Sequence, residues 1–345
     1  MSPIGIGIQG FGRMGRSLLR LLHERATQGQ DDLRLVALAD PADPKALAYL
    51  IRFDTLLGRF PAPVSLDEGS LLVAGKPIRL LSTDKPGEVP WGELGVEVVI
   101  EASPKPRSRA DLEKHLAAGA KRVILCSPPA EPPDLTVVEP LNGHLLSREH
   151  RIISNASSTA HCAGPVAKVL ADAFGIERLF LATVHAYTDQ QRLADVPESD
   201  WRRGRAAAEN IIPQETNAGA MLEELIPELA GRVTAMAMNV PVANGSLVDL
   251  VCWHQREVTV ATINEALCAA AAAERWAGVL AYETEPIVSS DVLGSQRTAV
   301  FDSDATMVLG SRVSKTLAWF DNASGYARRV LELVERFAVL DREAA

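Results

Sequence analysis

Six residues near the start of the chain have the types and spacing that bind the pyrophosphate of a dinucleotide. They are Gly10, Phe11, Gly12, Arg13, Met14 and Gly15, which form a Gly-x-Gly-x-x-Gly run. The first glycine of such a run permits a tight turn, the second lets the backbone approach the phosphates, and the third lets a helix pack closely. A strand pattern over residues 4–9 precedes the run and a helical pattern over residues 13–25 follows it, so a helix N-terminus faces the anion.

Asp40 is the second candidate for cofactor binding. It follows the strand pattern over residues 33–39. A carboxylate at this position accepts hydrogen bonds from the adenosine ribose hydroxyls and repels a 2′-phosphate, which favours NAD over NADP. The alternative is that Asp40 only begins a turn before Pro41.

The first half of the chain alternates β-rich runs with helical patterns. We expect strands at residues 4–9, 33–39, 96–101 and 122–125, and helices at residues 13–25 and 108–118. The strands are apolar almost throughout, as strands buried on both faces are. This alternation predicts an α/β fold with a parallel, doubly wound sheet of the Rossmann type.

The second half has a different character. Strand patterns cover residues 179–186, 234–240 and 247–253, and helical patterns cover residues 163–174 and 260–273. A further amphipathic helix is expected at residues 325–340. These patterns predict an α+β domain built on a sheet of its own.

Length and charge limit the class of protein. A chain of 345 residues is too long for one ordinary core and suggests two domains. A formal net charge of −9 argues against nucleic acid as the main partner. With no apolar run of ~18 residues and no signal-peptide pattern at the start, we expect a cytoplasmic protein without a membrane span.

The cysteines and histidines do not form a metal site. Cys126, Cys162, Cys252 and Cys268 are scattered without a Cys-x-x-Cys pair, and the seven histidines show no ligand spacing. This is typical of reduced cytoplasmic thiols and not of disulfides or zinc binding.

Six collinear segments identify a family. They are IQGFGRMGR at residues 8–16, IISNAS at 152–157, TVHAYT at 183–188, RAAAENIIP at 205–213, SSD at 289–291 and WFDN at 319–322. Through them the chain resembles phosphorylating glyceraldehyde-3-phosphate dehydrogenases over nearly its full length. The resemblance implies an NAD-binding Rossmann domain over residues 1–157, completed by a helix over 322–345, and a catalytic and oligomerisation domain over 158–321. It also implies a small-molecule aldehyde substrate and a homotetramer.

The nucleophile position departs from this family. The family carries its reactive cysteine in Ser-Asn-Ala-Ser-Cys-Thr-Thr-Asn-Cys, whereas residues 154–162 read SNASSTAHC, so Ser158 replaces it and Cys162 matches the second, structural cysteine. His185 matches the family's catalytic base. A serine hydroxyl is far less acidic than a thiol and needs a positioned base, and the resulting oxygen ester is a poorer acyl donor than a thioester. We therefore expect weak phosphorolysis.

The phosphate-binding positions are altered as well. The resemblance places Ser157, Thr159, Thr188, Thr216, Asn239 and Arg203 around the substrate phosphates. Asn239 stands where the family has an arginine, and the lysine of the family's Thr-Gly-Ala-Ala-Lys run is Ala220. An amide cannot replace a bidentate cation on phosphate. The basic cluster Arg202, Arg203 and Arg205 either retains some anion affinity or bridges subunits.

The nicotinamide side is mixed. Asn322 matches the asparagine that holds the carboxamide, Tyr326 is kept, and Ser127 is also expected to contact the cofactor. The family's Glu-Trp pair is Ala323 and Ser324 here.

Three functional hypotheses stay open. The first is an NAD-linked aldehyde oxidoreductase with altered or weakened chemistry, using Ser158 and His185. The second is a catalytically inactive NAD-binding paralogue that acts as a regulator or as an oligomer subunit, with Ser158 only capping a helix. The third is an esterase-like hydrolase, although no Gly-x-Ser-x-Gly elbow is present.

Overall fold

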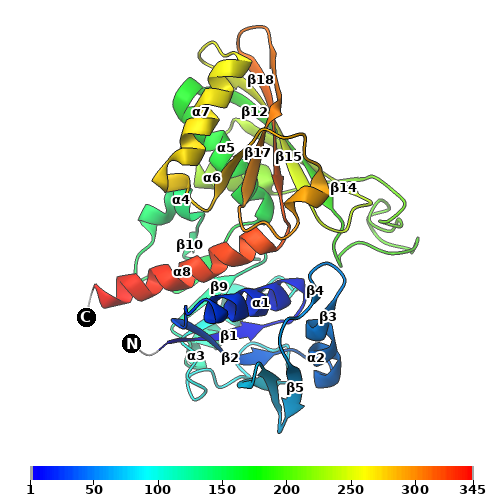
Figure 1. Ribbon diagram of the computed structural model, residues 1–345, viewed down its shortest axis with the longest axis vertical. Coiled ribbons are helices and arrows are strands. Elements are labelled where there is room, and N and C mark those ends of the chain that lie inside the picture. Colours follow the sequence, from blue (N-terminus) through cyan, green and yellow to red (C-terminus); the bar gives the residue numbers. More distant parts are fainter. Residues whose placement is uncertain (1–2, 344–345) are drawn as a thin grey trace. The chain divides into compact units, whose positions relative to one another are not determined.

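The protein divides into two compact units. The computed structural model describes residues 3–343 (Figure 1). The first unit contains the chain up to residue 137, residues 144–156 and the chain from residue 327 onward. The second unit contains residues 138–143 and 157–326.

A nine-stranded sheet forms the centre of the first unit, in the order β10-β11-β9-β8-β1-β2-β7-β6-β5. The strands are β1 (Ile4–Gln9), β2 (Leu33–Ala39), β5 (Val64–Asp67), β6 (Ser70–Val73), β7 (Lys76–Leu81), β8 (Val98–Glu101), β9 (Arg122–Leu125), β10 (Leu135–Thr136) and β11 (Ile152–Ser154). Strand β1 pairs in parallel with both β2 and β8, so the chain order changes direction at β1. The carboxyl ends of strands beside such a switch point are where doubly wound sheets bind ligands. The Rossmann expectation is confirmed.

The helices of this unit are α1 (Arg13–Thr27), α2 (Pro44–Arg52), α3 (Arg109–Ala117) and the part of α8 (Ser324–Arg342) that follows residue 326. A short hairpin of β3 (Phe53–Asp54) and β4 (Gly58–Arg59) follows α2. Arg122 fixes the end of α8, because its guanidinium lies 4.3 Å from the Phe337 ring centroid and 2.6 Å from Asp341. Burial of the guanidinium between a ring and a carboxylate ties α8 to the sheet.

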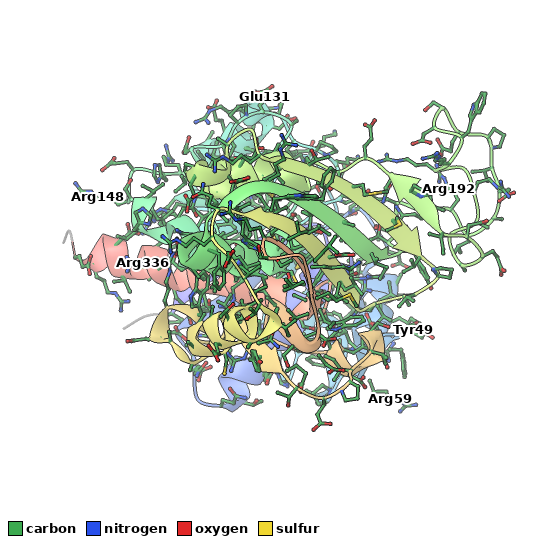
Figure 2. All side chains as sticks on the ribbon, turned by 90° about the horizontal axis from the view of Figure 1, so that it is seen from above. Tyr49, Arg59, Glu131, Arg148, Arg192 and Arg336 are labelled. Carbon is green, nitrogen blue, oxygen red and sulfur yellow. The ribbon has the colours of Figure 1, made fainter. Side chains whose placement is uncertain are left out.

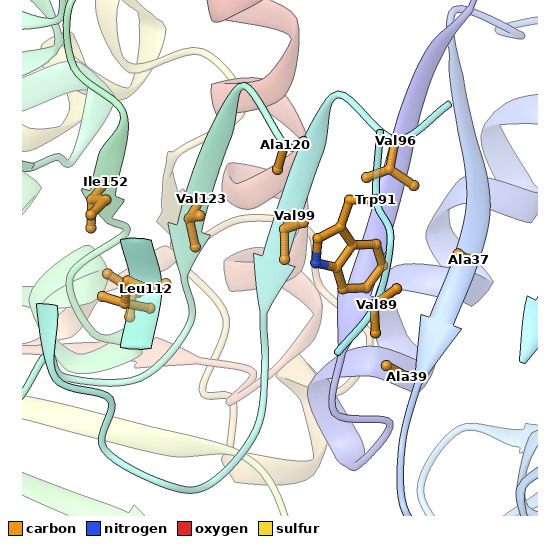
Figure 3. Close-up of a cluster of buried hydrophobic side chains, with 11 residues drawn as sticks. Ala37, Ala39, Val89, Trp91, Val96, Val99, Leu112, Ala120, Val123 and Ile152 are labelled. Atoms are coloured by element: carbon orange, nitrogen blue, oxygen red, sulfur yellow. The ribbon is translucent and has the colours of Figure 1, made fainter. Parts of the chain in front are cut away.

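The core of the first unit centres on Trp91, which is fully buried (Figure 3). Its ring lies with Val89, Val96 and Val99 in one apolar cluster. A Cβ atom added at Gly7 of β1 would lie 2.5 Å from the Trp91 ring. The absence of a side chain at Gly7 therefore makes room for the indole.

A seven-stranded mixed sheet forms the centre of the second unit, in the order β13-β14-β12-β15-β18-β17-β16. The strands are β12 (Ile176–Ala186), β13 (Ile212–Gln214), β14 (Val233–Val240), β15 (Ser246–His254), β16 (Leu280–Glu283), β17 (Ala299–Leu309) and β18 (Val313–Phe320). The helices are α4 (Glu139–Asn142), α5 (Ser158–Phe174), α6 (Ala218–Leu225) and α7 (Val260–Ala272). Helix α5 contacts the central strands β12, β15 and β18, and also α6 and α7 (Figure 1). The predicted α+β architecture is confirmed.

Helix α5 begins at Ser158, five residues before the helix that the sequence predicts at residues 163–174. Thr159, Gly164 and Pro165 lower the intrinsic helix propensity of this stretch. Ser157 offsets this by capping the helix, since its Oγ accepts the backbone N–H of Ala160 at 3.2 Å. Nearly all side chains from Thr159 to Ala167 are buried, so packing decides the helix start.

Within residues 3–343, no helix is long and apolar enough to cross a membrane. The same part of the chain contains no group of three or more His, Cys, Asp or Glu side chains that could hold a metal ion.

His254 should make the stability of the protein depend on pH. Its Nδ1–H donates to the Gly175 carbonyl at 3.0 Å and its Nε2 accepts from Ser314 at 2.7 Å. Burial holds the pKa of this imidazole below its usual value of 6.5. The unfolded chain takes up a proton below pH ~6.5 while the folded protein does not, so stability present above that pH is lost as pH falls toward the folded pKa.

A His254→Asn variant removes this titration. We expect its free energy of unfolding, from urea titrations between pH 7.5 and 5.0, to fall less steeply than that of the wild type, whose His254 contributes up to about 1.4 kcal/mol per pH unit. His144 is exposed, so His144→Asn should keep the wild-type slope. Equal slopes in wild type and His254→Asn would contradict this role.

Candidate active site

The candidate residues fall into two groups, one in each unit. In the first unit the turn from β1 to α1 carries the glycine run. Gly10 adopts φ +91°, and a Cβ atom there would lie 2.6 Å from Cα and N of Ser103. A Cβ atom at Gly15 would lie 2.6 Å from the Gly10 carbonyl oxygen. These two glycines are therefore required by the fold of the turn itself.

Gly12 differs from its two neighbours in the run. It is exposed, its φ is −70°, and a Cβ atom there would meet no atom within 4 Å. The fold alone does not require a glycine at this position. Open space above the backbone beside the start of α1 is what the close approach of a pyrophosphate needs.

The other residues of the run are partly or fully buried, and the backbone of Phe11 contacts Asp40. Phe11 is buried, while Arg13 and Met14 are half-buried in the first turn of α1. The Phe11 N–H donates to Oδ2 of Asp40 at 2.7 Å, and the Ala42 N–H donates to Oδ1 at 2.9 Å. Both carboxylate oxygens of Asp40 are thus fixed directly beside the glycine turn.

Ser127 lies two residues beyond β9, at the same carboxyl edge of the sheet. Its Oγ is buried and has no hydrogen-bond partner among the described residues. A buried hydroxyl without a partner is rare and calls for a ligand or water to satisfy it. The open space at Gly12, the fixed Asp40 carboxylate and this hydroxyl all fit a bound dinucleotide.

His185 is the central residue of the group in the second unit. It lies near the end of β12, with Nδ1 2.6 Å from the Ala186 carbonyl oxygen. A carbonyl only accepts, so Nδ1 carries the proton and Nε2 presents a lone pair. The Asn322 amide nitrogen is 3.3 Å from Nε2 and can donate to it. The imidazole is therefore held in the neutral form that a general base needs.

Further hydrogen bonds fix Asn322. Its Oδ1 accepts from the Ser246 hydroxyl at 2.9 Å, and that hydroxyl accepts the Ala186 N–H at 2.9 Å. This orients the amide so that its nitrogen, not its oxygen, faces His185. The backbone N–H of Asn322 also donates to Asn244 at 3.1 Å. Ser246 and Asn244 were missed by the sequence analysis because only the folded sheet brings them to Asn322.

Asp321 anchors the segment that carries Asn322. It is buried, and its Oδ1 accepts the N–H groups of Ala323 and Ser324 at 2.8 and 2.7 Å. Its Oδ2 accepts from the Asn244 amide at 2.7 Å. This carboxylate caps the start of α8 and thereby holds Asn322 in place.

Ser158 is the first residue of α5 and is half-buried. The residue two positions before it, Ala156, has φ +53°, a conformation that costs free energy for a residue with a Cβ atom and clusters at functional sites. Within the described part of the chain, Ser158 makes no hydrogen bond to His185. The proposed nucleophile and base thus lie on separate elements and are not hydrogen-bonded to each other.

Asn239 lies beside His185 because the two residues are register partners on β14 and β12. Asn239 is buried, and the Gln214 amide of β13 donates to its Oδ1. The register neighbour of His185 on β14 is therefore a neutral amide that is itself held by a second neutral amide. Gln214 is a second residue that the sequence analysis missed.

The remaining proposed phosphate contacts are engaged locally. Thr188 Oγ1 donates to Gln191 at 3.1 Å, and Thr216 Oγ1 accepts the Ala218 N–H at 3.2 Å at the start of α6. Thr159 is buried within α5.

Three of the four arginines of the long loop between β12 and β13 are paired with acids. Arg192 contacts Glu198, Arg203 lies 3.7 Å from Asp200, and Arg205 lies 2.9 Å from Asp195. Figure 2 shows Arg192 on this loop, which projects away from the sheet of the second unit. These exposed pairs offset the positive charge that a phosphate would need.

Tyr326 is buried and packs edge-on against His161, with ring centroids 5.4 Å apart. Cys162 does not supply a reactive thiol. Its Sγ is 3.6 Å from the Ala318 carbonyl oxygen, and burial raises its pKa well above the usual value. Burial also raises the pKa of Cys252 to about 12.

A Rossmann unit with a glycine turn and a carboxylate beside it, in one chain with a mixed-sheet unit, is the architecture of two-domain NAD-linked dehydrogenases. Comparison with known proteins gives the family. Residues 4–109 match the glyceraldehyde 3-phosphate dehydrogenase NAD-binding domain, and residues 157–322 match the glyceraldehyde 3-phosphate dehydrogenase C-terminal domain.

Full-length relatives agree with these matches. The chain is 45% identical over 331 residues to glyceraldehyde-3-phosphate dehydrogenase of Streptomyces coelicolor, covering 96% of this chain and 97% of that protein. It is 43% identical over 336 residues to the enzyme of Geobacillus stearothermophilus, covering 97% and 98% of the two chains. The chain belongs to the glyceraldehyde-3-phosphate dehydrogenase family.

Two glycine substitutions separate folding from cofactor binding in the turn. Gly12→Ala should change the free energy of unfolding by less than about 0.5 kcal/mol, because nothing lies near its Cβ, yet raise the Kd for NAD about tenfold or more by occupying the pyrophosphate's space. Gly10→Ala should instead destabilise the protein by about 1–3 kcal/mol through its φ and its clash with Ser103. Calorimetry with and without NAD measures both; unchanged NAD affinity in Gly12→Ala would refute the assignment.

Proposed function

We propose that the protein is an NAD-linked aldehyde oxidoreductase of this family whose chemistry is altered by Ser158 and Asn239. The observation that carries the proposal is the His185 imidazole, which Ala186 and Asn322 hold with a basic Nε2. This arrangement leaves a lone pair on a half-buried imidazole, which is what a general base needs. Residues 1–157 with the C-terminal helix would bind the cofactor, and residues 158–321 would bind the aldehyde.

His185 would act as the general base in this reaction. It would take the proton of the attacking hydroxyl, from Ser158 or from water, as the carbonyl becomes tetrahedral. Asn322 would hold the imidazole during this transfer. Bound NAD would supply the hydride acceptor. An oxygen ester formed at Ser158 is a poorer acyl donor than a thioester, so its release would be slow. Because Asn239 supplies no cation to bind phosphate, we propose that water, deprotonated by His185, releases the acid and restores the Ser158 hydroxyl.

We propose an uncharged aldehyde as the substrate class, or one whose phosphate lies elsewhere than in the family. Asn239, which accepts from the Gln214 amide, places a neutral group beside His185, and three of the four loop arginines are matched by acids. Such a surface can hydrogen-bond hydroxyl groups but cannot neutralise a phosphate dianion. Ser157, Thr159, Thr188 and Thr216 would supply further hydroxyl contacts.

A homotetramer in the cytoplasm is proposed from family membership. Large apolar side chains that are exposed in the single chain support an oligomer. Trp201 is 87% exposed and Leu193 is 80% exposed on the loop between β12 and β13. Exposed apolar side chains at this density are typical of protein interfaces.

The alternative of an inactive NAD-binding paralogue is favoured by one observation. Ser158 and His185 share no hydrogen bond within the described residues, so the nucleophile is not activated in this state. The same observation weighs against an esterase-like hydrolase, which needs a paired serine and histidine.

Cofactor choice tests the role of Asp40. An Asp40→Asn variant loses the charge that repels a 2′-phosphate, so the ratio of the NADP Kd to the NAD Kd should fall roughly tenfold. Asp43 caps α2 by accepting the Lys45 N–H at 3.0 Å and provides a matched nearby charge. Asp43→Asn should leave that ratio unchanged. A wild-type protein that prefers NADP would contradict the proposed ribose contact.

Turnover tests the role of His185. The wild type, NAD and a panel of uncharged aldehydes should produce NADH, followed by its absorbance. His185→Asn should lower kcat about 10²- to 10⁴-fold while the NAD Kd stays within about twofold. His144→Asn, which alters an exposed histidine, serves as the control. Absence of turnover in a wild type that binds NAD would favour the inactive paralogue.

A further inference from the structure

A buried polar chain links α3 to the nucleotide-binding edge of the first unit. Trp91, His115 and Glu101 are all fully buried. The Trp91 indole N–H donates to His115 Nδ1 at 3.0 Å, and His115 Nε2 lies 3.3 Å from Glu101 Oε2. These residues are 24 and 14 positions apart in the sequence. Buried polar groups need such partners, since an unsatisfied one costs about 1–3 kcal/mol.

The partners of His115 fix its protonation. An indole nitrogen is a donor only, so Nδ1 must be the acceptor. The proton therefore sits on Nε2, and the ring donates to the Glu101 carboxylate. An imidazolium would place two N–H groups against each other at the Trp91 contact. His115 is thus a neutral donor, and its orientation sets that of the carboxylate.

Glu101 passes this orientation to the nucleotide turn. It is the last residue of β8, and its Oε1 accepts the backbone N–H of Ser103 at 3.0 Å as well as the Ser103 hydroxyl. The Ser103 backbone is the group against which Gly10 is packed, with no room for a Cβ atom between them. The Ala102 N–H donates to the Gln9 carbonyl at 2.8 Å at the same place.

Arg107 closes the segment on its other side. Its Nε donates to Glu101 Oε2 at 3.2 Å and its Nη2 donates to the Asp84 carbonyl at 2.8 Å. It also neutralises the buried carboxylate, which would otherwise be costly to desolvate. One carboxylate therefore holds both ends of residues 103–107.

We propose that His115 is a positioning residue for the dinucleotide, which it orders through Glu101 and Ser103 without touching it. The inference rests on the proposed binding of NAD. Removing the imidazole leaves the Glu101 carboxylate one donor short, so it can turn away from Ser103. The Ser103 backbone that packs against Gly10 then becomes more mobile. Ordering it when the cofactor binds costs free energy, which weakens binding.

The test compares substitutions in α3 that remove the hydrogen bonds between Trp91, His115 and Glu101 with a substitution in α3 that leaves these bonds in place. His115→Phe keeps a buried ring and removes both hydrogen bonds, so the Kd for NAD should rise about tenfold. Leu112→Ala opens a cavity on the same helix and leaves Glu101 alone, so it should lose stability but keep its NAD Kd within about twofold. His115→Gln can still donate to Glu101 and should recover most of the affinity.

Hydrogen exchange on the apoprotein gives a readout that does not depend on NAD. The backbone amides of Ala102, Ser103, Lys105 and Arg107 should exchange faster in His115→Phe than in Leu112→Ala. Wild-type NAD affinity in His115→Phe, or an equal loss in Leu112→Ala at matched stability, would overturn this inference alone. A wild-type protein that binds no NAD would overturn the proposed function as well.

Discussion

The hydrogen bond from His185 Nδ1 to the carbonyl of Ala186 is the interaction on which the proposed chemistry of the second unit depends. It fixes the neutral tautomer and leaves Nε2 as the acceptor, which faces the Asn322 amide. That amide is oriented by Ser246, and its segment is anchored by the buried Asp321. Strand β15 pairs with both β12 and β18 in the sheet of the second unit, and this register brings these groups together.

Around this base lie the positions at which we propose that the chain departs from the family in charge and nucleophilicity. Ser158 offers an alcohol with no hydrogen bond to the base within the described residues, and the buried Cys162 thiol has too high a pKa to replace it. Asn239 and Gln214 form a neutral pair where the family resemblance implies a cation. The cofactor half has the features expected of a dinucleotide site. Together these features support the proposal of an NAD-linked oxidoreductase with altered substrate and acyl chemistry.

The sequence predicts local features well and distant ones poorly. The Gly10–Gly15 run, the strand at residues 33–39 and Asp40 depend on neighbouring residues, so their pattern is visible along the chain. Helix α5 begins earlier than predicted, because burial of this stretch overrides the weak helix propensity of Thr159, Gly164 and Pro165. Gln214, Ser246 and the Trp91–His115–Glu101 chain could not be predicted, because strand register and packing bring them to their partners. The strands β16 to β18 were missed for the same reason.

The most direct measurement of the central claim is a single-turnover comparison of the wild type with Ser158→Cys, each mixed with NAD and either glyceraldehyde or glyceraldehyde 3-phosphate, with and without inorganic phosphate. The account predicts that NADH formation by the wild type does not depend on phosphate and does not favour the phosphorylated aldehyde. It also predicts that Ser158→Cys gains a phosphate-dependent second step while still lacking that preference, because Asn239 is unchanged. Rapid, phosphate-dependent oxidation of glyceraldehyde 3-phosphate by the wild type would contradict it.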